Sequence, residues 1–194
     1  MPQKIILASA SPRRKELMQL ITNSFEIIPS NFDESLVPAE LCPVEHVIYS
    51  SKMKALDISS RYKDSIVIGC DTIVTIDNTI LGKPKDKEQA KEMLSMLSGN
   101  KHRVLTGICI AINNESEIDD YEATIVNFAE LDENIIDRYI ASNEPMDKAG
   151  AYAIQGKGSV LIKSIEGCFF NVVGLPIYKL SRMLEKYGVC IICE

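Results

Sequence analysis

A short apolar run near the N-terminus, followed at once by a turn rich in serine and arginine, constrains this chain more than any other stretch. Residues 4–8 (KIILA) are apolar after the lysine and have the length of a buried strand. Ser11 is a favourable helix N-cap, and Pro12 suits the first helical position. Apolar residues then recur at helical spacing, at Leu17, Leu20 and Ile21. The sequence therefore predicts a strand, a tight turn and a helix as its first unit.

The turn of this unit has the chemistry of an anion site. It carries the hydroxyls of Ser9 and Ser11 and the guanidinium groups of Arg13 and Arg14. Helix N-termini favour anions, and arginines add charge-assisted contacts to phosphate oxygens. The glycines and the lysine of a Walker loop are missing. Two interpretations stay open on these residues alone, namely an anion site or two solvated arginines.

Composition narrows the classes of protein to consider. The chain has 194 residues, 46% of them apolar and 25% charged, which is typical of a soluble globular protein, and we expect one domain over residues 1–194. The net charge of −6 argues against a nucleic-acid binder. No apolar stretch reaches transmembrane length, and the N-terminus lacks a signal-peptide pattern. We therefore expect a cytoplasmic protein with neither nucleic acid nor membrane as a partner.

Strand and helix patterns alternate along the rest of the chain. We expect strands at residues 25–28, 65–70, 73–76, 104–112, 121–128, 160–165, 168–173 and 189–193. Helices are expected to open at Pro43, Asp86, Asp132 and Pro176. Asn113 and Asn114 suggest a hairpin turn between two long strands. The mixture of βα units and hairpins predicts an α/β fold with a mixed central sheet flanked by helices.

The six cysteines do not suggest a metal centre. Four of them stand singly in apolar or mixed stretches and are interpreted as buried free thiols, at Cys42, Cys70, Cys109 and Cys168. Cys190 and Cys193 form a C-x-x-C pattern inside an apolar tail, without a second pair at zinc spacing. A buried terminal strand is the favoured interpretation of that tail.

Two acidic positions are candidates for catalysis. Asp71 follows a buried strand, where open α/β sheets present ligands, and could bind a metal or accept a proton from water. Taken alone, Asp71 is better explained as an aspartate that caps a turn through Thr72. Glu34 lies in a polar loop after Asp33 and could share a magnesium ion with Asp71 if the fold brings the two together. Sequence spacing does not establish that.

Further polar residues complete the candidate set. Lys54 borders the apolar stripe of its helix, and Lys83 precedes a proline in a loop; a lysine in either place is more often a surface charge than a ligand. With Arg13 and Arg14 they would supply four cations for a triphosphate. Gln155 lies in a glycine-punctuated loop, where its amide suits a nucleobase edge or a turn. His102 is expected to make a structural hydrogen bond rather than to act as a base.

These stretches, in this order, resemble the Maf family of nucleoside triphosphate pyrophosphatases. The matching motifs span nearly the whole chain: residues 8–14 (ASASPRR) with Leu17, 33–34 (DE), 54–55 (KA), 69–72 (GCDT), 81–84 (LGKP), 97–99 (LSG) with His102, Val104 and Thr106, 148–156 (KAGAYAIQG) and 171–176 (NVVGLP). Two positions depart mildly from the common pattern, Cys70 and the pair at 51–52, and neither removes a candidate catalytic group.

The resemblance implies an activity and a role for each candidate. The implied reaction converts a nucleoside triphosphate to the monophosphate and pyrophosphate with a divalent cation, Mg²⁺ or Mn²⁺. Asp71 would be the proton acceptor, and Glu34 with Asp71 would bind the metal. The other implied catalytic residues are Arg14, Lys54, Lys83 and Ser9. Arg13, Thr72 and Gln155 match the subfamily specific for dTTP and UTP.

The same resemblance implies a fold with two lobes around a cleft, similar to inosine triphosphate pyrophosphatase, and a homodimer as one assembly. Two other functions stay open. The enzyme could act on 7-methyl-GTP or another modified nucleotide, including modified pyrimidines. Alternatively, the chain could be a non-enzymatic regulator of cell division that uses the cleft as a nucleotide or partner sensor.

Overall fold

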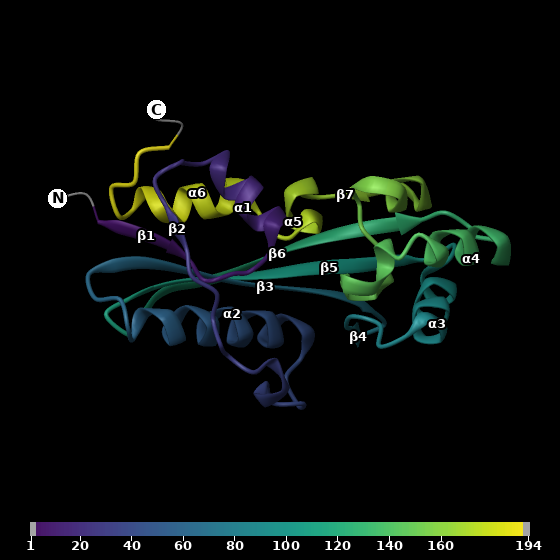
Figure 1. The fold of residues 1–194 in the computed structure, drawn as a ribbon, viewed down its shortest axis with the longest axis horizontal. Helices are drawn as coiled ribbons and strands as arrows, with labels where there is room; N and C mark the ends of the chain where they lie inside the picture. The colour runs from purple at the N-terminus through teal and green to yellow at the C-terminus, as the bar shows by residue number, and fades with distance from the viewer. Residues whose placement is uncertain (1–2, 192–194) are drawn as a thin grey trace.

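The computed structural model describes residues 3–191, which form a mixed seven-stranded sheet flanked by helices (Figure 1). The strand order is β2-β1-β3-β5-β6-β7, with β4 paired to β3. The strands are β1 (Lys4–Leu7), β2 (Glu26–Ile27), β3 (Ser65–Ile76), β4 (Thr79–Leu81), β5 (Lys101–Ile112), β6 (Glu115–Phe128) and β7 (Ile162–Glu166). Strand β1 runs parallel to β2 and β3, and the other pairings are antiparallel.

The helices cover both faces of this sheet. They are α1 (Pro12–Gln19), α2 (Pro43–Ser59), α3 (Lys87–Leu97), α4 (Glu133–Ala141), α5 (Phe169–Val173) and α6 (Ile177–Glu185). Figure 1 shows α1, α5 and α6 on one side of the long strands and α2 on the other, with α3 and α4 at the far end. Short 3-10 helices occur at Glu34–Leu36, Glu144–Asp147, Ala149–Ala151 and Gly156–Leu161.

Helix α2 packs unusually close to the sheet at two glycines. A Cβ at Gly69 of β3 would lie 2.1 Å from the Ser51 carbonyl oxygen, and one at Gly107 of β5 would lie 2.1 Å from that of Val47. Such distances are incompatible with any side chain, so glycine is required at both places. The close approach brings Lys54 of α2 against β3.

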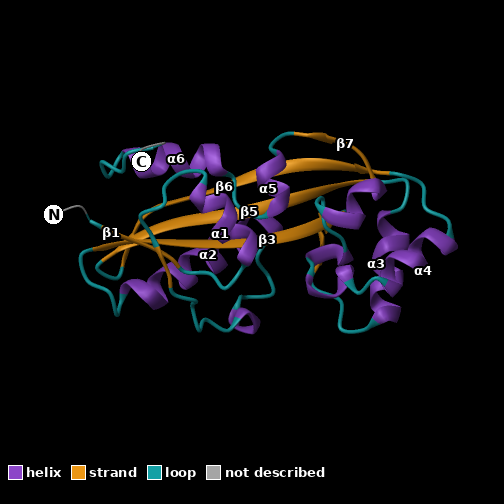
Figure 2. Cartoon of the chain, turned by 45° about the horizontal axis from the view of Figure 1, so that its top comes forward, coloured by secondary structure: helices purple, strands orange, loops and turns teal. Residues whose placement is uncertain are grey.

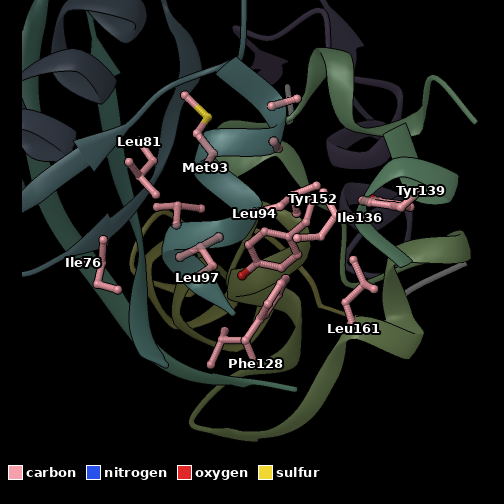
Figure 3. Close-up of a cluster of buried hydrophobic side chains, with 14 of the residues drawn as sticks. Ile76, Leu81, Met93, Leu94, Leu97, Phe128, Ile136, Tyr139, Tyr152 and Leu161 are labelled. Carbon is pink, nitrogen blue, oxygen red and sulfur yellow. The ribbon is translucent and has the colours of Figure 1, made fainter. Parts of the chain in front are cut away.

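Two large hydrophobic clusters lie at opposite ends of the long strands. One joins α3 and α4 to the sheet and includes Leu94, Leu97, Phe128, Ile136 and Tyr152 (Figure 3). The other joins α1 and α6 to the sheet and includes Leu7, Met18, Ile68, Ile110 and Leu184. Strands β3 and β5 contribute to both clusters, so the two lobes share one continuous sheet (Figure 2).

The edge of β3 is left open between the lobes. Strand β1 pairs with residues 65–68 of β3, and β4 pairs with residues 74–76. Among the described strands none pairs with the intervening residues 69–73 on this side. Asp71 and Thr72 lie in that gap, and they point to opposite faces because side chains alternate along a strand. The sheet topology therefore presents these two side chains to whatever fills the gap.

The predicted mixed sheet with flanking helices is confirmed, but the strand predicted at residues 168–173 is wrong. Residues 168–173 were expected to be extended, whereas α5 is a helix that ends at Gly174 with φ 124°. A short apolar run has no periodicity with which to separate a buried helix from a strand. Long-range contacts hold this helix against the sheet: the side-chain amide of Asn171 is fully buried and donates to Val104 O (3.0 Å) and Thr124 Oγ1 (2.9 Å).

Smaller predictions are also corrected. Leu20 is 57% exposed, and Met18 takes the expected inward position on α1. Strand β7 begins at Ile162 and not at Val160, because residues before it form the 3-10 helix Gly156–Leu161, in which Val160 is 78% exposed. Cys70 and Cys109 are buried free thiols as expected, whereas Cys42 is free but exposed.

The tail also differs from its prediction. Residues 189–191 form no strand, and Cys190 is exposed and disulfide-bonded. The rest of the predicted terminal strand, with Cys193, lies outside the described residues.

Candidate functional site

A cavity of about 530 Å³ opens at the gap in the sheet edge. Its walls come from the turn before α1, residues 29–34, β3, α2, the segment 147–155 and the end of α5. Among the described lining residues five are basic and three acidic: Arg13, Arg14, Lys54, Lys83 and Lys148 against Glu34, Asp71 and Asp147. A chain of net charge −6 thus lines this one hollow with an excess of positive charge, which favours an anionic ligand.

The two candidate carboxylates meet on one ammonium group. Lys54 Nζ lies 2.7 Å from Glu34 Oε1 and 2.6 Å from Asp71 Oδ1. The side chains of Lys54 and Asp71 are each 10% exposed, whereas that of Glu34 is 62% exposed. The question left open by the sequence is thereby answered, because Glu34 and Asp71 come within hydrogen-bond reach of a single nitrogen. Both carboxylates line the cavity.

Local structure explains how Glu34 reaches this position. Asp33 caps the short 3-10 helix Glu34–Leu36, and its side chain accepts a hydrogen bond from Ser35 N (2.9 Å). That hydrogen bond from Ser35 lowers the pKa of Asp33. Asp33 therefore orients the turn, and Glu34 supplies the carboxylate inside the cavity.

Arg14 forms a hub that ties three segments together. Its Nε donates to Gly174 O (2.8 Å), its Nη1 to Cys70 O (2.9 Å) and Ser9 Oγ (3.4 Å), and its Nη2 to Thr72 Oγ1 (2.9 Å). A guanidinium has five N–H donors, so four are engaged by the protein itself. Arg14 lines the cavity, yet most of its hydrogen-bonding capacity holds the cavity wall together.

The serine turn is built as the sequence suggested. Ser11 caps α1 and its hydroxyl accepts from Arg14 N (3.4 Å), while Pro12 occupies the first turn. Ser9 Oγ accepts from Ser11 N (3.2 Å) as well as from Arg14. Each hydroxyl retains its own O–H donor for a ligand. The predicted cap is confirmed, and both serines lie on the cavity wall.

The other two candidate cations, Lys83 after β4 and Arg13 on α1, reach the cavity from different lobes. Lys83 is exposed and lines the cavity next to the buried Pro84. Arg13 also lines it and lies 3.9 Å from Asp147. Sequence reasoning missed Lys148, whose ammonium is paired with Asp147 and whose side chain is only 13% exposed. Its place in the same glycine-rich motif as Gln155 was the available signal.

The base-reading candidates lie at the cavity edge. Gln155 is exposed and lines the cavity. Thr72 lines it as well, although its hydroxyl is engaged with Arg14 and with Thr106 Oγ1 (2.9 Å). His102 does not belong to the lining residues. Its predicted structural hydrogen bond is confirmed, since Nε2 and the Tyr152 hydroxyl oxygen lie 2.7 Å apart, and burial lowers the pKa of His102 to about 4.

The cysteine beside Asp71 is not suited to nucleophilic chemistry. Burial raises the pKa of the Cys70 thiol, the residue before Asp71, to about 11, so it is protonated at neutral pH and is a poor nucleophile. Within residues 3–191 no three histidine, cysteine, aspartate or glutamate side chains are grouped so that they could hold a metal ion by themselves. A cation bound here would have two carboxylates and would need further oxygens from a ligand and water. That donor set suits Mg²⁺, which keeps several waters and takes few protein carboxylates.

Comparison with known proteins finds a family and relatives that match nearly the whole chain. The family model described as Maf-like protein matches residues 4–187. A dTTP/UTP pyrophosphatase of Ruminiclostridium cellulolyticum is 46% identical over 98% of this chain and 99% of its own length. One of Clostridium botulinum strain Okra is 48% identical, covering 96% of this chain and 98% of its own. A solved HAM1 protein from Coxiella burnetii superposes with a TM-score of 0.48 and 16% identity, covering 95% and 99% of the two chains. None of the described helices is long and apolar enough to cross a membrane.

Proposed function

Since this chain belongs to the Maf-like protein family, we propose that it is a nucleoside triphosphate pyrophosphatase that converts dTTP and UTP to the monophosphate and pyrophosphate with the help of a divalent cation. The family assignment rests on the match over residues 4–187 and on relatives that are nearly half identical over almost the full chain. Those relatives are named for dTTP and UTP, and this chain has Arg13, Thr72 and Gln155 on its cavity wall.

The proposal depends mainly on one observation: the carboxylates of Glu34 and Asp71 both pair with the ammonium group of Lys54 inside a cavity lined by an excess of basic residues. A triphosphate brings several negative charges, which Arg13, Lys83 and Lys148 can meet at the wall. The volume of about 530 Å³ lies within the range of small-ligand sites. Two carboxylates in this cavity would repel a bound triphosphate, because both carry negative charge. Their presence therefore favours a second, cationic component or an activated water.

The residues fit a divalent metal through their chemistry. Glu34 and Asp71 supply two hard oxygen ligands on one side of the cavity, and substrate phosphate oxygens and water would supply the rest. When bound, such a cation would neutralise phosphate charge and hold the triphosphate against the wall. The ammonium of Lys54 stands between the same two carboxylates. Binding would therefore require Lys54 to give up part of its contact with them.

The chain's own residues suffice to describe the hydrolytic step. Asp71 accepts the proton of a water that attacks the α-phosphorus; a new P–O bond forms as the α–β bridging P–O bond breaks, and pyrophosphate leaves in line. Lys54, Lys83 and Lys148 stabilise the negative charge that grows on the leaving group. Arg14 holds Ser9, Cys70 O and Thr72 in fixed positions around this step. Preorganised donors of this kind cost no reorganisation during the reaction.

We assign recognition of the base to the part of the cavity rim that carries Gln155. Gln155 presents an amide, which offers both a donor and an acceptor to the edge of a thymine or uracil ring. Arg13 lies 3.9 Å from Asp147, and both line the same cavity as Gln155. Modified pyrimidines that keep this edge would be accepted as well.

The test is a measurement of pyrophosphate release from a panel of nucleoside triphosphates with Mg²⁺ or Mn²⁺, with and without EDTA. We expect dTTP and UTP to be the best substrates and EDTA to abolish release. Highest activity on 7-methyl-GTP would reassign the substrate class. Binding of nucleotide without release of any product would favour the non-enzymatic sensor, and activity in EDTA would contradict the metal requirement.

A further inference from the structure

The loop that carries Gln155 is held at both ends by two side chains that lie outside the cavity wall. On one side the Tyr139 hydroxyl, on α4, accepts a hydrogen bond from Ala153 N (3.2 Å). On the other side the Glu144 carboxylate accepts from Lys157 N (3.0 Å) and Gly158 N (2.8 Å). Gln155 stands midway between these anchors, so its backbone position is set by them.

The two anchors are joined to each other. The Tyr139 hydroxyl donates to Glu144 Oε1 at 3.1 Å, and Tyr139 is only 5% exposed. Burial raises the pKa of Glu144, but the hydrogen bonds from Lys157, Gly158 and Tyr139 outweigh it, so the net pKa is lowered. The acceptor is therefore a charged carboxylate at neutral pH, and hydrogen bonds to a charged group are stronger than those between neutral groups.

The glycines of the loop fit closely around these anchors. Gly156 has φ +71°, and a Cβ there would lie 2.8 Å from Glu144 Oε2. A Cβ at Gly158 would lie 2.5 Å from the Tyr139 hydroxyl oxygen. The backbone thus wraps directly onto Glu144 and Tyr139, with no space for a side chain between them. A loop rich in glycine has many alternative conformations, and these contacts select one.

We propose that Glu144 is a positioning residue for base recognition, because it fixes the loop that presents Gln155 and thereby sets the preference for thymine and uracil. This inference rests on the function proposed above. The same 3-10 helix, Glu144–Asp147, also carries Asp147, which lies 3.9 Å from Arg13. One short turn therefore contacts both of the segments expected to read the base. Displacing a hydrogen-bonding side chain by about 1 Å can cost a hundredfold in rate.

The experiment is a double-mutant cycle read in the ratio of kcat/KM for dTTP to kcat/KM for dCTP. Gln155→Ala is expected to lower this ratio about tenfold, the effect of one lost hydrogen bond of about 1.4 kcal/mol. Glu144→Ala is expected to lower it by a similar factor, mainly through the KM for dTTP. Because Glu144 acts through Gln155, the double variant is expected to show the ratio of Gln155→Ala alone.

A matched control and a gentler variant separate positioning from general damage. Glu92→Ala, at an exposed site on α3, should leave the ratio unchanged. Tyr139→Phe removes one hydroxyl and should lower the ratio by a smaller factor, which keeps the test available if Glu144→Ala does not fold. The inference would be overturned if the wild type discriminates between dTTP and dCTP and Glu144→Ala keeps the wild-type ratio. If Glu144→Ala does not fold, an unchanged ratio in Tyr139→Phe would overturn it. Additive effects of Glu144→Ala and Gln155→Ala in the double variant would overturn it as well. Absence of pyrophosphate release by the wild-type protein would instead contradict the proposed function.

Discussion

Lys54 and Asp71 form an ion pair in which Nζ and Oδ1 are 2.6 Å apart and both side chains are 10% exposed. The pair joins α2 to the stretch of β3 that lacks a strand partner on its open edge, so it is part of the wall as well as of the proposed chemistry. Removing one partner of a buried pair leaves the other charge uncompensated, at a cost of about 3–5 kcal/mol. Variants at this place must therefore preserve shape if their effects on turnover are to be interpreted.

Asp71→Asn is expected to abolish most turnover while nucleotide still binds. The amide keeps the shape and an acceptor for Lys54 but cannot take a proton from water, and loss of a general base typically costs about 10²–10⁴-fold. Pyrophosphate release and calorimetric nucleotide binding are the measurements. Asp77→Asn, the same change in the exposed turn that ends β3, is the control, because asparagine tolerates its φ of 48°. Near-normal turnover in Asp71→Asn would remove Asp71 from its role.

Lys54→Met is expected to bind Mn²⁺ more tightly in the absence of nucleotide, and to hydrolyse dTTP more slowly. The ammonium occupies the two carboxylate oxygens that a metal would need, so its removal frees them. The dissociation constant of Mn²⁺ can be measured by electron paramagnetic resonance. Lys52→Met, on the same helix and paired with Asp119 at 3.7 Å, is the matched control. Weaker Mn²⁺ binding in Lys54→Met would contradict this competition.

Arg14→Lys is expected to lower the free energy of unfolding by about 2–4 kcal/mol, because hydrogen bonds from a charged donor contribute about 1.5–3 kcal/mol each. Lysine has three donors on one nitrogen and cannot span Gly174 O, Cys70 O and the Thr72 hydroxyl. Urea unfolding measures the effect. Arg13→Lys, one residue earlier, should change stability by less than about 0.5 kcal/mol. Equal stabilities of the two variants would show that the hub does not hold the wall.

His102 is expected to make stability fall with pH below neutrality. Its folded pKa of about 4 lies below the ordinary 6.5, so the unfolded chain takes up the proton first. The stabilising contribution is complete above about pH 6.5 and is lost as the pH falls towards 4, with a slope of at most about 1.4 kcal/mol per pH unit. Urea unfolding between pH 7 and pH 4.5 should show a shallower slope for His102→Gln than for the wild type. Identical slopes would mean that other groups carry the acid sensitivity.

Much of the fold could be predicted from local patterns. The strand, turn and helix at the N-terminus, with Ser11 as cap and Pro12 after it, are confirmed, because capping is decided by residues within one turn. The hairpin at Asn113 and Asn114 is confirmed for the same reason, since both residues have positive φ. Helix α5 was missed because its five residues cover little more than one helical turn, too few to show the 3.6-residue periodicity on which such predictions depend.

Several residues of the cavity wall could be predicted from the sequence, but the contacts between them could not. Asp71, Lys54 and Glu34 could be identified as candidates, yet their meeting on one ammonium depends on how closely α2 approaches β3 at Gly69. The Arg14 hub and the Glu144 anchor could not be foreseen, because half or more of their hydrogen bonds are to backbone carbonyls and amides, which carry no sequence signal. Long-range contacts of this kind become visible only when the chain is folded.

The uninterrupted passage of β3 and β5 through both hydrophobic clusters limits how the molecule can move. A hinge between the lobes would have to bend strands that are hydrogen-bonded to neighbours along their length. Adaptation to a nucleotide is therefore expected at residues 29–34 on the rim of the cavity, because Tyr139 and Glu144 hold the loop around Gln155 and the shared strands keep the lobes in their mutual orientation. The protein would therefore bind its ligand in a rigid cavity whose rim adjusts at one segment of the chain.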